Sequence, residues 1–149
     1  MKREIKFRGF NTKNNKWLYG DLIHNRGLTF VCPVGIADPF ETWKDFVVET
    51  ESVGQFTGLH DCNGKEIYEG DIIKTPRGNI GMVIFGKAEE TVTHYVFRRK
   101  VTDVYTTYGW VFERINDGYR CAIDDSILDG NCIGNIHDNP ELIERKSNE

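Results

Sequence analysis

His60, Asp61 and Cys62 are adjacent residues of the types that nucleophilic catalysis uses. A catalytic thiol needs a base within hydrogen-bond reach and a third group that orients this base. The Asn63-Gly64 pair that follows is typical of a two-residue hairpin turn with positive φ at both positions. Three residues beside such a turn rarely meet the catalytic geometry. The sequence therefore favours a solvated turn over a catalytic site.

Glu69 and Asp71 form a second candidate site, a pair of carboxylates around Gly70. General acid and base pairs need environments that separate their pKa values. At a glycine-containing bend, an aspartate more often accepts hydrogen bonds from nearby backbone N–H groups. We therefore interpret this segment as a structural bend.

Cysteine and histidine spacing does not indicate a metal site, because no C-x-x-C pair and no closely spaced histidine pair occurs. The glycines form neither a phosphate-binding loop nor a dinucleotide-binding motif. We expect no catalytic residue, no metal and no cofactor, and we predict that the protein is not an enzyme. The cysteines, which are expected to stay as free thiols, are Cys32, Cys62, Cys121 and Cys132.

Two basic segments contain aromatic residues, a combination that can bind nucleic acid by phosphate contacts and base stacking. The alternative is a hairpin with charged outward positions and an aromatic core face. A net charge of −4 and a pI of about 5.6 argue against an overall basic duplex-binding surface. The basic residues are Lys2, Arg3, Lys6, Arg8, Lys13 and Lys16 in the first segment, and Arg98, Arg99 and Lys100 in the second.

The length of 149 residues suits one domain or two small ones. Aromatic residues make up 12% of the chain and it has 15 glycines, which favours short strands joined by tight turns. Neither an apolar membrane span nor a signal peptide is recognised, so we expect a cytoplasmic location and no membrane association.

Period-two alternation predicts several short antiparallel strands, with an opening hairpin over 5–20 and a strand at 27–32. A helix start is predicted at Asp38, with Pro39 at its first position. A strand over 91–101 is expected to pair with 110–112 across a turn at 106–109. The fold class is therefore mainly β, with α+β as the alternative, and contains one or two short helices.

Three segments resemble the YopX family. The longest is Val53-Gly54-Gln55-Phe56-Thr57-Gly58-Leu59, followed by Asp61 and by Asn63-Gly64-Lys65-Glu66-Ile67-Tyr68-Glu69-Gly70-Asp71-Ile72-Ile73. The flanking segments, 5–10 and 133–142, resemble the family's opening and its end. His60 departs from the residue types usual at its position. The resemblance therefore extends over nearly the whole chain.

The resemblance implies a phage or prophage protein of unestablished molecular function, with an SH3-like barrel in its C-terminal part. We divide the chain into an N-terminal β-rich subdomain, 1–52, and a barrel subdomain, 53–149. The matching residues are candidates for a structural or interaction role, without catalytic assignment. These are Gln55, Thr57, Gly58, Asp61, Gly64, Glu69, Gly70, Asp71, Gly134 and Asn135.

Aromatic residues on both faces of the opening hairpin lead us to expect a homo-oligomer, by default a dimer. The hairpin carries Phe7, Phe10, Trp17 and Tyr19. The preferred function is non-enzymatic macromolecular binding with self-association, and the partner could also be a host or phage protein. The alternative is a nucleic-acid-binding module that uses the barrel and the basic N-terminal residues.

Overall fold

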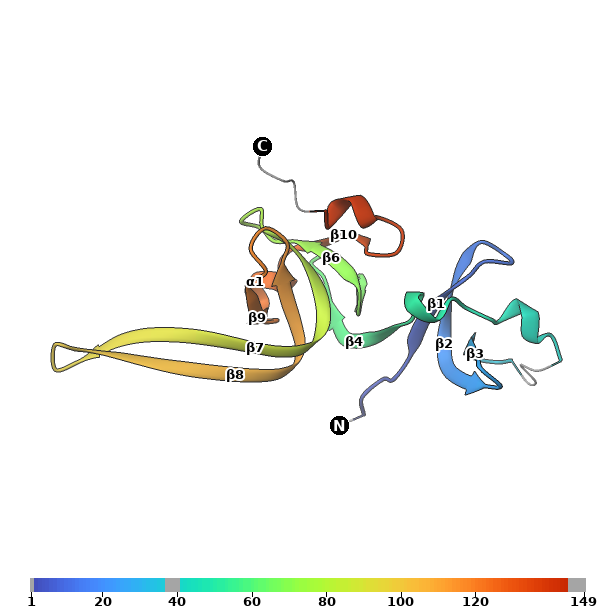
Figure 1. Cartoon of the computed structure of the whole chain (residues 1–149), viewed down its shortest axis with the longest axis horizontal. Coiled ribbons are helices and arrows are strands. Elements are labelled where there is room, and N and C mark those ends of the chain that lie inside the picture. The colour runs from blue at the N-terminus through green and yellow to red at the C-terminus, as the bar shows by residue number, and fades with distance from the viewer. Residues whose placement is uncertain (1, 37–40, 145–149) are drawn as a thin grey trace. The chain divides into compact units, whose positions relative to one another are not determined.

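The computed structural model describes residues 2–36 and 41–144, which contain ten β-strands, one α-helix and three short 3-10 helices (Figure 1). All assigned strand pairs are antiparallel. The mainly β prediction is confirmed. The chain forms two compact units, residues 1–59 with 66–69 and residues 60–65 with 70–149, whereas the sequence analysis divided it after residue 52.

The first unit contains a sheet of strand order β3-β2-β1-β4-β5. Leu18, Val31 and Val48 form its buried cluster, against which Leu22 and Phe46 pack. The opening hairpin is confirmed, with Phe7 opposite Gly20 and Asn11 opposite Lys16. The strands are β1 (Phe7–Asn11), β2 (Lys16–Asn25), β3 (Leu28–Cys32), β4 (Gly54–His60) and β5 (Glu66–Tyr68).

The predicted helix start at Asp38 and Pro39 lies outside the described residues. In the described part that follows, Trp43–Asp45 forms a 3-10 helix, η1. Val47 then forms an isolated antiparallel bridge with Phe30. A second 3-10 helix, η2 (Thr50–Ser52), leads into β4.

The second unit contains a sheet of strand order β10-β6-β7-β8-β9. Ile72, Ile73, Val83 and Val111 are fully buried in it. Its strands are β6 (Asp71–Lys74), β7 (Ile80–Val96), β8 (Arg99–Arg114), β9 (Arg120–Ala122) and β10 (Asn131–Asn135). Two short helices complete it, α1 (Asp125–Leu128) and η3 (Pro140–Leu142).

The SH3-like barrel is not confirmed, because the second sheet does not close. Its end strands are β10 and β9, and no pairing among the described residues joins them. Among the described residues, no helix is long and apolar enough to cross a membrane.

The predicted pairing of 91–101 with 110–112 is wrong. β7 and β8 instead form one long hairpin, in which Trp110 lies opposite Phe85 and Arg99 opposite Val96. The turn consists of Phe97 and Arg98, whose φ values are +49° and +64°. Neither residue type is usual in such a turn. The sequence therefore favoured a turn at 106–109, which contains a glycine.

The turn at Asn63-Gly64 also differs from the prediction. Only Gly64 has positive φ, +78°, whereas Asn63 is not among the residues in that region. The Gly64 N–H donates to the Asp61 carbonyl, and the Asp61 N–H donates to the Lys65 carbonyl, at 3.0 and 2.9 Å. This is a three-residue turn that ends in a left-handed glycine, so one positive φ is sufficient.

Candidate functional site in the β7–β8 arm

Asp61, the first family-motif residue of the second unit, holds backbone groups together. Its Oδ1 accepts from the N–H groups of Asn63 and Lys65, both at 2.9 Å. Its Oδ2 accepts from the Cys132 N–H at 2.9 Å. Burial works to raise the pKa of Asp61, but the three N–H donors outweigh burial and lower this pKa. The carboxylate thus joins the 61–65 turn to β10.

Gly70 and Asp71 lie where the second unit begins its sheet. Gly70 has a φ of +88°, and its N–H donates to the Val83 carbonyl at 2.8 Å. Asp71 is 1% exposed, and its Oδ2 lies 3.9 Å from Cys132 Sγ. This burial suits a structural position more than a site open to substrate.

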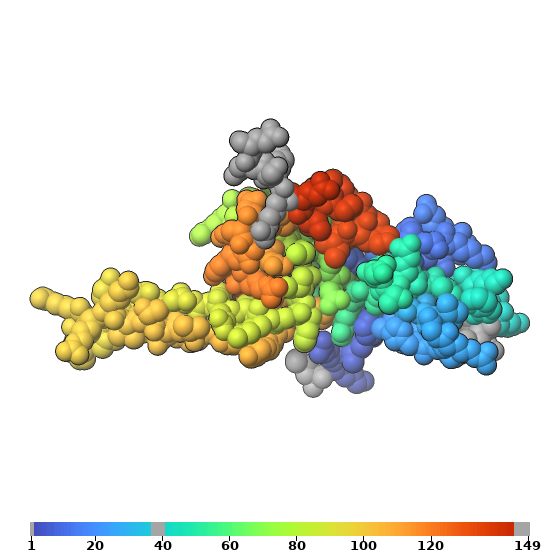
Figure 2. Space-filling model, viewed as in Figure 1, coloured from blue at the N-terminus to red at the C-terminus, as the bar shows by residue number. Residues whose placement is uncertain are grey.

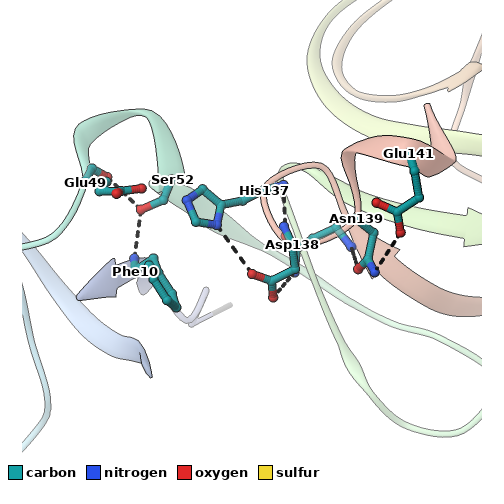
Figure 3. Close-up of polar contacts among 8 residues, drawn as sticks. Phe10, Glu49, Ser52, His137, Asp138, Asn139 and Glu141 are labelled. Carbon is teal, nitrogen blue, oxygen red and sulfur yellow. Dashed lines mark hydrogen bonds and ion pairs between the residues drawn. The ribbon is translucent and has the colours of Figure 1, made fainter. Parts of the chain in front are cut away.

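Gly134 and Asn135 are the last two residues of β10, and the turn that follows contains His137, Asp138 and Asn139 (Figure 3). The Asn135 Oδ1 accepts from the His137 and Asp138 N–H groups at 3.0 and 2.8 Å. A Cβ on Gly134 would lie 2.3 Å from Asn139 Oδ1, so a side chain at this position would have to displace the Asn139 amide. Both motif residues therefore have local structural contacts.

The motif residues of the first unit lie in β4 and directly after β5. The Thr57 hydroxyl donates to the Ile67 carbonyl at 2.8 Å, and the Glu69 N–H donates to the Gln55 carbonyl at 2.9 Å. Gly58 has a φ of +84°. Burial raises the pKa of the Glu69 carboxyl, and the Arg8 guanidinium opposes this rise. The ten motif residues are thus divided between the units and do not converge on one pocket.

The placement of the thiols and histidines favours neither a metal site nor a nucleophilic site. Within the described ranges, no group of three or more metal-ligating side chains could hold a metal ion. Burial raises the pKa of Cys32 and Cys121, which disfavours the nucleophilic thiolate. Cys62 is exposed, while the Asp61 carboxylate beside it accepts backbone hydrogen bonds.

Several N-terminal cations are engaged within the first unit. Lys6 Nζ lies 2.6 Å from Glu66 Oε1, and Lys13 Nζ lies 2.6 Å from Asp45 Oδ1. Arg8 is 6% exposed, with its guanidinium 4.9 Å from the Trp17 ring centroid. In the same unit, the Phe10 N–H donates to Ser52 Oγ at 2.7 Å (Figure 3). These contacts explain part of the basic, aromatic N-terminal pattern without nucleic acid.

The least covered element is the outer part of the β7–β8 hairpin, residues 85–110, which we call the arm. β6 pairs with β7 only at Ile80, Gly81 and Met82. β9 pairs with β8 only at residues 111–113. The arm is therefore a two-stranded ribbon that extends away from the remainder of its unit (Figure 1). Figure 2 shows it in yellow and orange as a narrow projection.

Both faces of the arm expose apolar side chains. Residues directly opposite each other share a face, so the pairing of β7 with β8 assigns each side chain. One face carries Phe85, Tyr95, Val104 and Tyr108, which are 65, 71, 61 and 76% exposed. The other carries Val92, Val96 and Tyr105, which are 47, 43 and 57% exposed. Although Ala88 near the base is only 1% exposed, the apolar side chains named above remain exposed on both faces.

The tip of the arm combines an exposed aromatic ring with positive charge. Phe97 is 97% exposed, and Arg98, Arg99 and Lys100 follow it. Near the base, Glu89 and Glu90 supply negative charge, and Lys87 Nζ lies 2.7 Å from Glu89 Oε1. Charge thus changes sign along the arm, from acidic near the base to basic at the tip.

Sequence reasoning identified the basic tip but missed the arm. The signal was the alternation that continues on both sides of 97–98, together with the glycines at 86 and 109, which lie opposite each other. A long hairpin accounts for all of this alternation, whereas the shorter expected strands left part of it unassigned.

Comparison with known proteins gives a family and similar solved structures. No curated protein matches the chain. The crystal structure of protein EF1440 from Enterococcus faecalis is similar at 23% identity and a TM-score of 0.44, covering 96% of this chain and 100% of that chain. The sequence pattern of the YopX protein family matches residues 6–144. The resemblance noted in the sequence is therefore confirmed, and the chain belongs to the YopX family.

Proposed function

We propose that the protein is a non-enzymatic binding protein whose arm holds another macromolecule, and that it self-associates. The observation that carries this proposal is the exposure of apolar side chains on both faces of a two-stranded ribbon. An isolated hairpin is marginally stable in water, so a third strand or a covering surface stabilises it. Exposed apolar patches commonly mark interaction sites.

The setting that we propose is the cytoplasm of a bacterial cell, in which the chain acts as an accessory protein of a phage or prophage. Family membership supports this setting, as does the absence of a candidate membrane-spanning helix among the described residues. The motif residues support a non-enzymatic role, because the side chains of Thr57, Asp61 and Asn135 bond to the surrounding backbone.

Site-specific photo-cross-linking in the host cell tests the role of the arm. Phe97 is replaced by the photo-reactive amino acid p-benzoylphenylalanine, and the cross-linked species are identified by mass spectrometry. Tyr119, which is 46% exposed in the same unit but outside the arm, receives the same replacement as a control. We expect discrete macromolecular adducts at 97 and few at 119. Equal or weaker cross-linking at 97 would contradict the proposal.

A second candidate function is nucleic-acid binding through the tip of the arm. The observation that favours it is the cluster Arg98, Arg99 and Lys100 beside the exposed rings of Tyr95 and Phe97. Such a surface can contact phosphates and stack bases. The same cross-linking experiment distinguishes the candidates, because the adducts would then contain nucleic acid rather than protein.

A further inference from the structure

We infer that the partner of the arm is the arm of a second copy of this chain, paired antiparallel through the outer edge of β7. In this arrangement Val92 lies opposite Val96 of the partner subunit, the acidic residues Glu89 and Glu90 approach the basic turn of the partner, and a four-stranded sheet forms across a two-fold axis at His94. The inference rests on the proposed role of the arm as a binding surface and identifies what it binds.

The outer edge of β7 is available for such pairing beyond Met82, because β6 pairs with β7 only up to that residue. Val96 and Arg99 close the two-residue turn and therefore form a hydrogen-bonded pair. By alternation, the backbone groups of Thr91, Thr93 and Tyr95 point away from β8. Lys87 follows the same alternation, and its carbonyl accepts from Arg120 at 3.4 Å, as expected of an outward group. From residue 89 to 96, the outward backbone groups can form hydrogen bonds with a neighbouring strand.

The charge pattern selects an antiparallel copy. Thr91–Val96 carries no acidic, lysine or arginine residue; Glu89 and Glu90 precede it, and Arg98 and Arg99 follow the exposed Phe97. An antiparallel pair places the acidic end of each segment against the basic end of the other. A parallel pair would place like charges opposite each other, which destabilises a sheet.

Backbone alternation agrees with the register that the charges require. With His94 on the two-fold axis, Thr93 faces the partner's Tyr95, and both present outward backbone groups, while Glu90 lies near the partner's basic turn. Val92 then lies opposite the partner's Val96. These two valines are 47 and 43% exposed in the single chain, and the pairing covers part of both. The ribbon also becomes the centre of a four-stranded sheet, which relieves its marginal stability.

Charge reversal with mixing tests the orientation. The first variant is Glu89→Lys with Glu90→Lys, and the second is Arg98→Glu with Arg99→Glu. Sedimentation equilibrium of the wild-type chain should give twice 17.2 kDa. Each variant alone places like charges together, and we expect its dimer dissociation constant to rise at least tenfold. An equimolar mixture restores both sets of opposite-charge contacts, and a heterodimer of near-wild-type affinity should form.

The matched control is Lys74→Glu with Arg77→Glu, which reverses two exposed charges of the same unit outside the arm. This control should dimerise as the wild-type chain does. Only folded variants can form the heterodimer in the mixture, so unfolding of a variant cannot produce the expected result. Failure of the mixture to associate would overturn the inference.

A disulfide test fixes the register. In a Cys62→Ser background, His94→Cys places two thiols opposite each other at the two-fold axis, where they should oxidise to a covalent dimer. Thr102→Cys, on the opposite strand of the ribbon, should stay monomeric under the same oxidant. Equal cross-linking of both variants would contradict pairing through β7.

A single 17.2 kDa species for the wild-type chain would also overturn the inference. In that case the self-association part of the proposed function would fail as well, but strong cross-linking of position 97 to a host protein or nucleic acid would still support binding of a macromolecule by the arm. Loss of cross-linking at 97 would contradict the proposed function instead. The two results are therefore distinguishable.

Discussion

Asp61 joins segments that lie 71 positions apart in the chain, through its bond to the Cys132 N–H. We expect Asp61→Asn to lower the free energy of unfolding by about 1–3 kcal/mol, because an amide has one acceptor atom where the carboxylate has two. Urea denaturation of both proteins at pH 7 measures this difference. An unchanged midpoint would show that the three bonds contribute little.

The same carboxylate predicts how stability changes with pH. The pKa of Asp61 is lower in the folded chain than in the unfolded chain, so its contribution is complete above the unfolded pKa of about 4. That contribution is lost as the pH falls from there through the folded pKa. Between pH 6 and pH 3, wild type should therefore lose more stability than Asp61→Asn. Equal losses in the two proteins would contradict this assignment.

Gly64 allows a test of the turn that is free of steric contacts. A Cβ there would meet nothing within 4 Å, so only the φ of +78° disfavours substitution. Gly64→Val should cost about 1 kcal/mol or more, whereas Gly64→Asn should cost less because asparagine tolerates this region. Chemical denaturation of the two variants checks the order, and equal effects would contradict the assigned turn.

At the scale of elements, removal of the arm should leave the remainder of its unit folded. The variant lacks residues 89–106 and joins Ala88 to Thr107 through Asn-Gly, which keeps a residue pair that already lies opposite. Because no third strand pairs with the arm, we expect the unfolding free energy to change by less than about 1–2 kcal/mol. Circular dichroism melts measure this. A collapse of stability would show that the arm supports the core.

The elements also show where sequence reasoning succeeds. The opening hairpin was predictable because alternation and a polar turn at 12–15 agree. The long hairpin was not, because its turn at Phe97-Arg98 lacks glycine, asparagine and proline. Asp61 lay within the family motif, but its bond to Cys132 depends on a distant segment that no local pattern reports. The arm was missed for a related reason. Its exposure depends on which strands pair with other strands, and this pairing is not visible in a local sequence pattern.

At the scale of the molecule, the net charge of −4 predicts weak binding of nucleic acid. An acidic chain with one basic tip should bind single-stranded oligonucleotides weakly at about 150 mM salt, because few phosphates are neutralised. Fluorescence anisotropy over a salt series checks this, with Arg98→Glu and Arg99→Glu as the control variant. Tight binding that this variant abolishes would favour the nucleic-acid candidate.

The turn at the tip of the arm is strained, and this strain bears on what the tip can bind. Both central residues of its turn hold positive φ without being glycine or asparagine, a conformation that costs on the order of 1 kcal/mol per residue. Asn-Gly at 97 and 98 would relax that strain, yet it would remove the exposed ring and one cation. If stability alone were selected, the relaxed turn would be expected at these positions. The strained turn keeps an exposed aromatic ring and a cation together at the end of the arm, so a substitution that relaxes the turn is expected to weaken binding there.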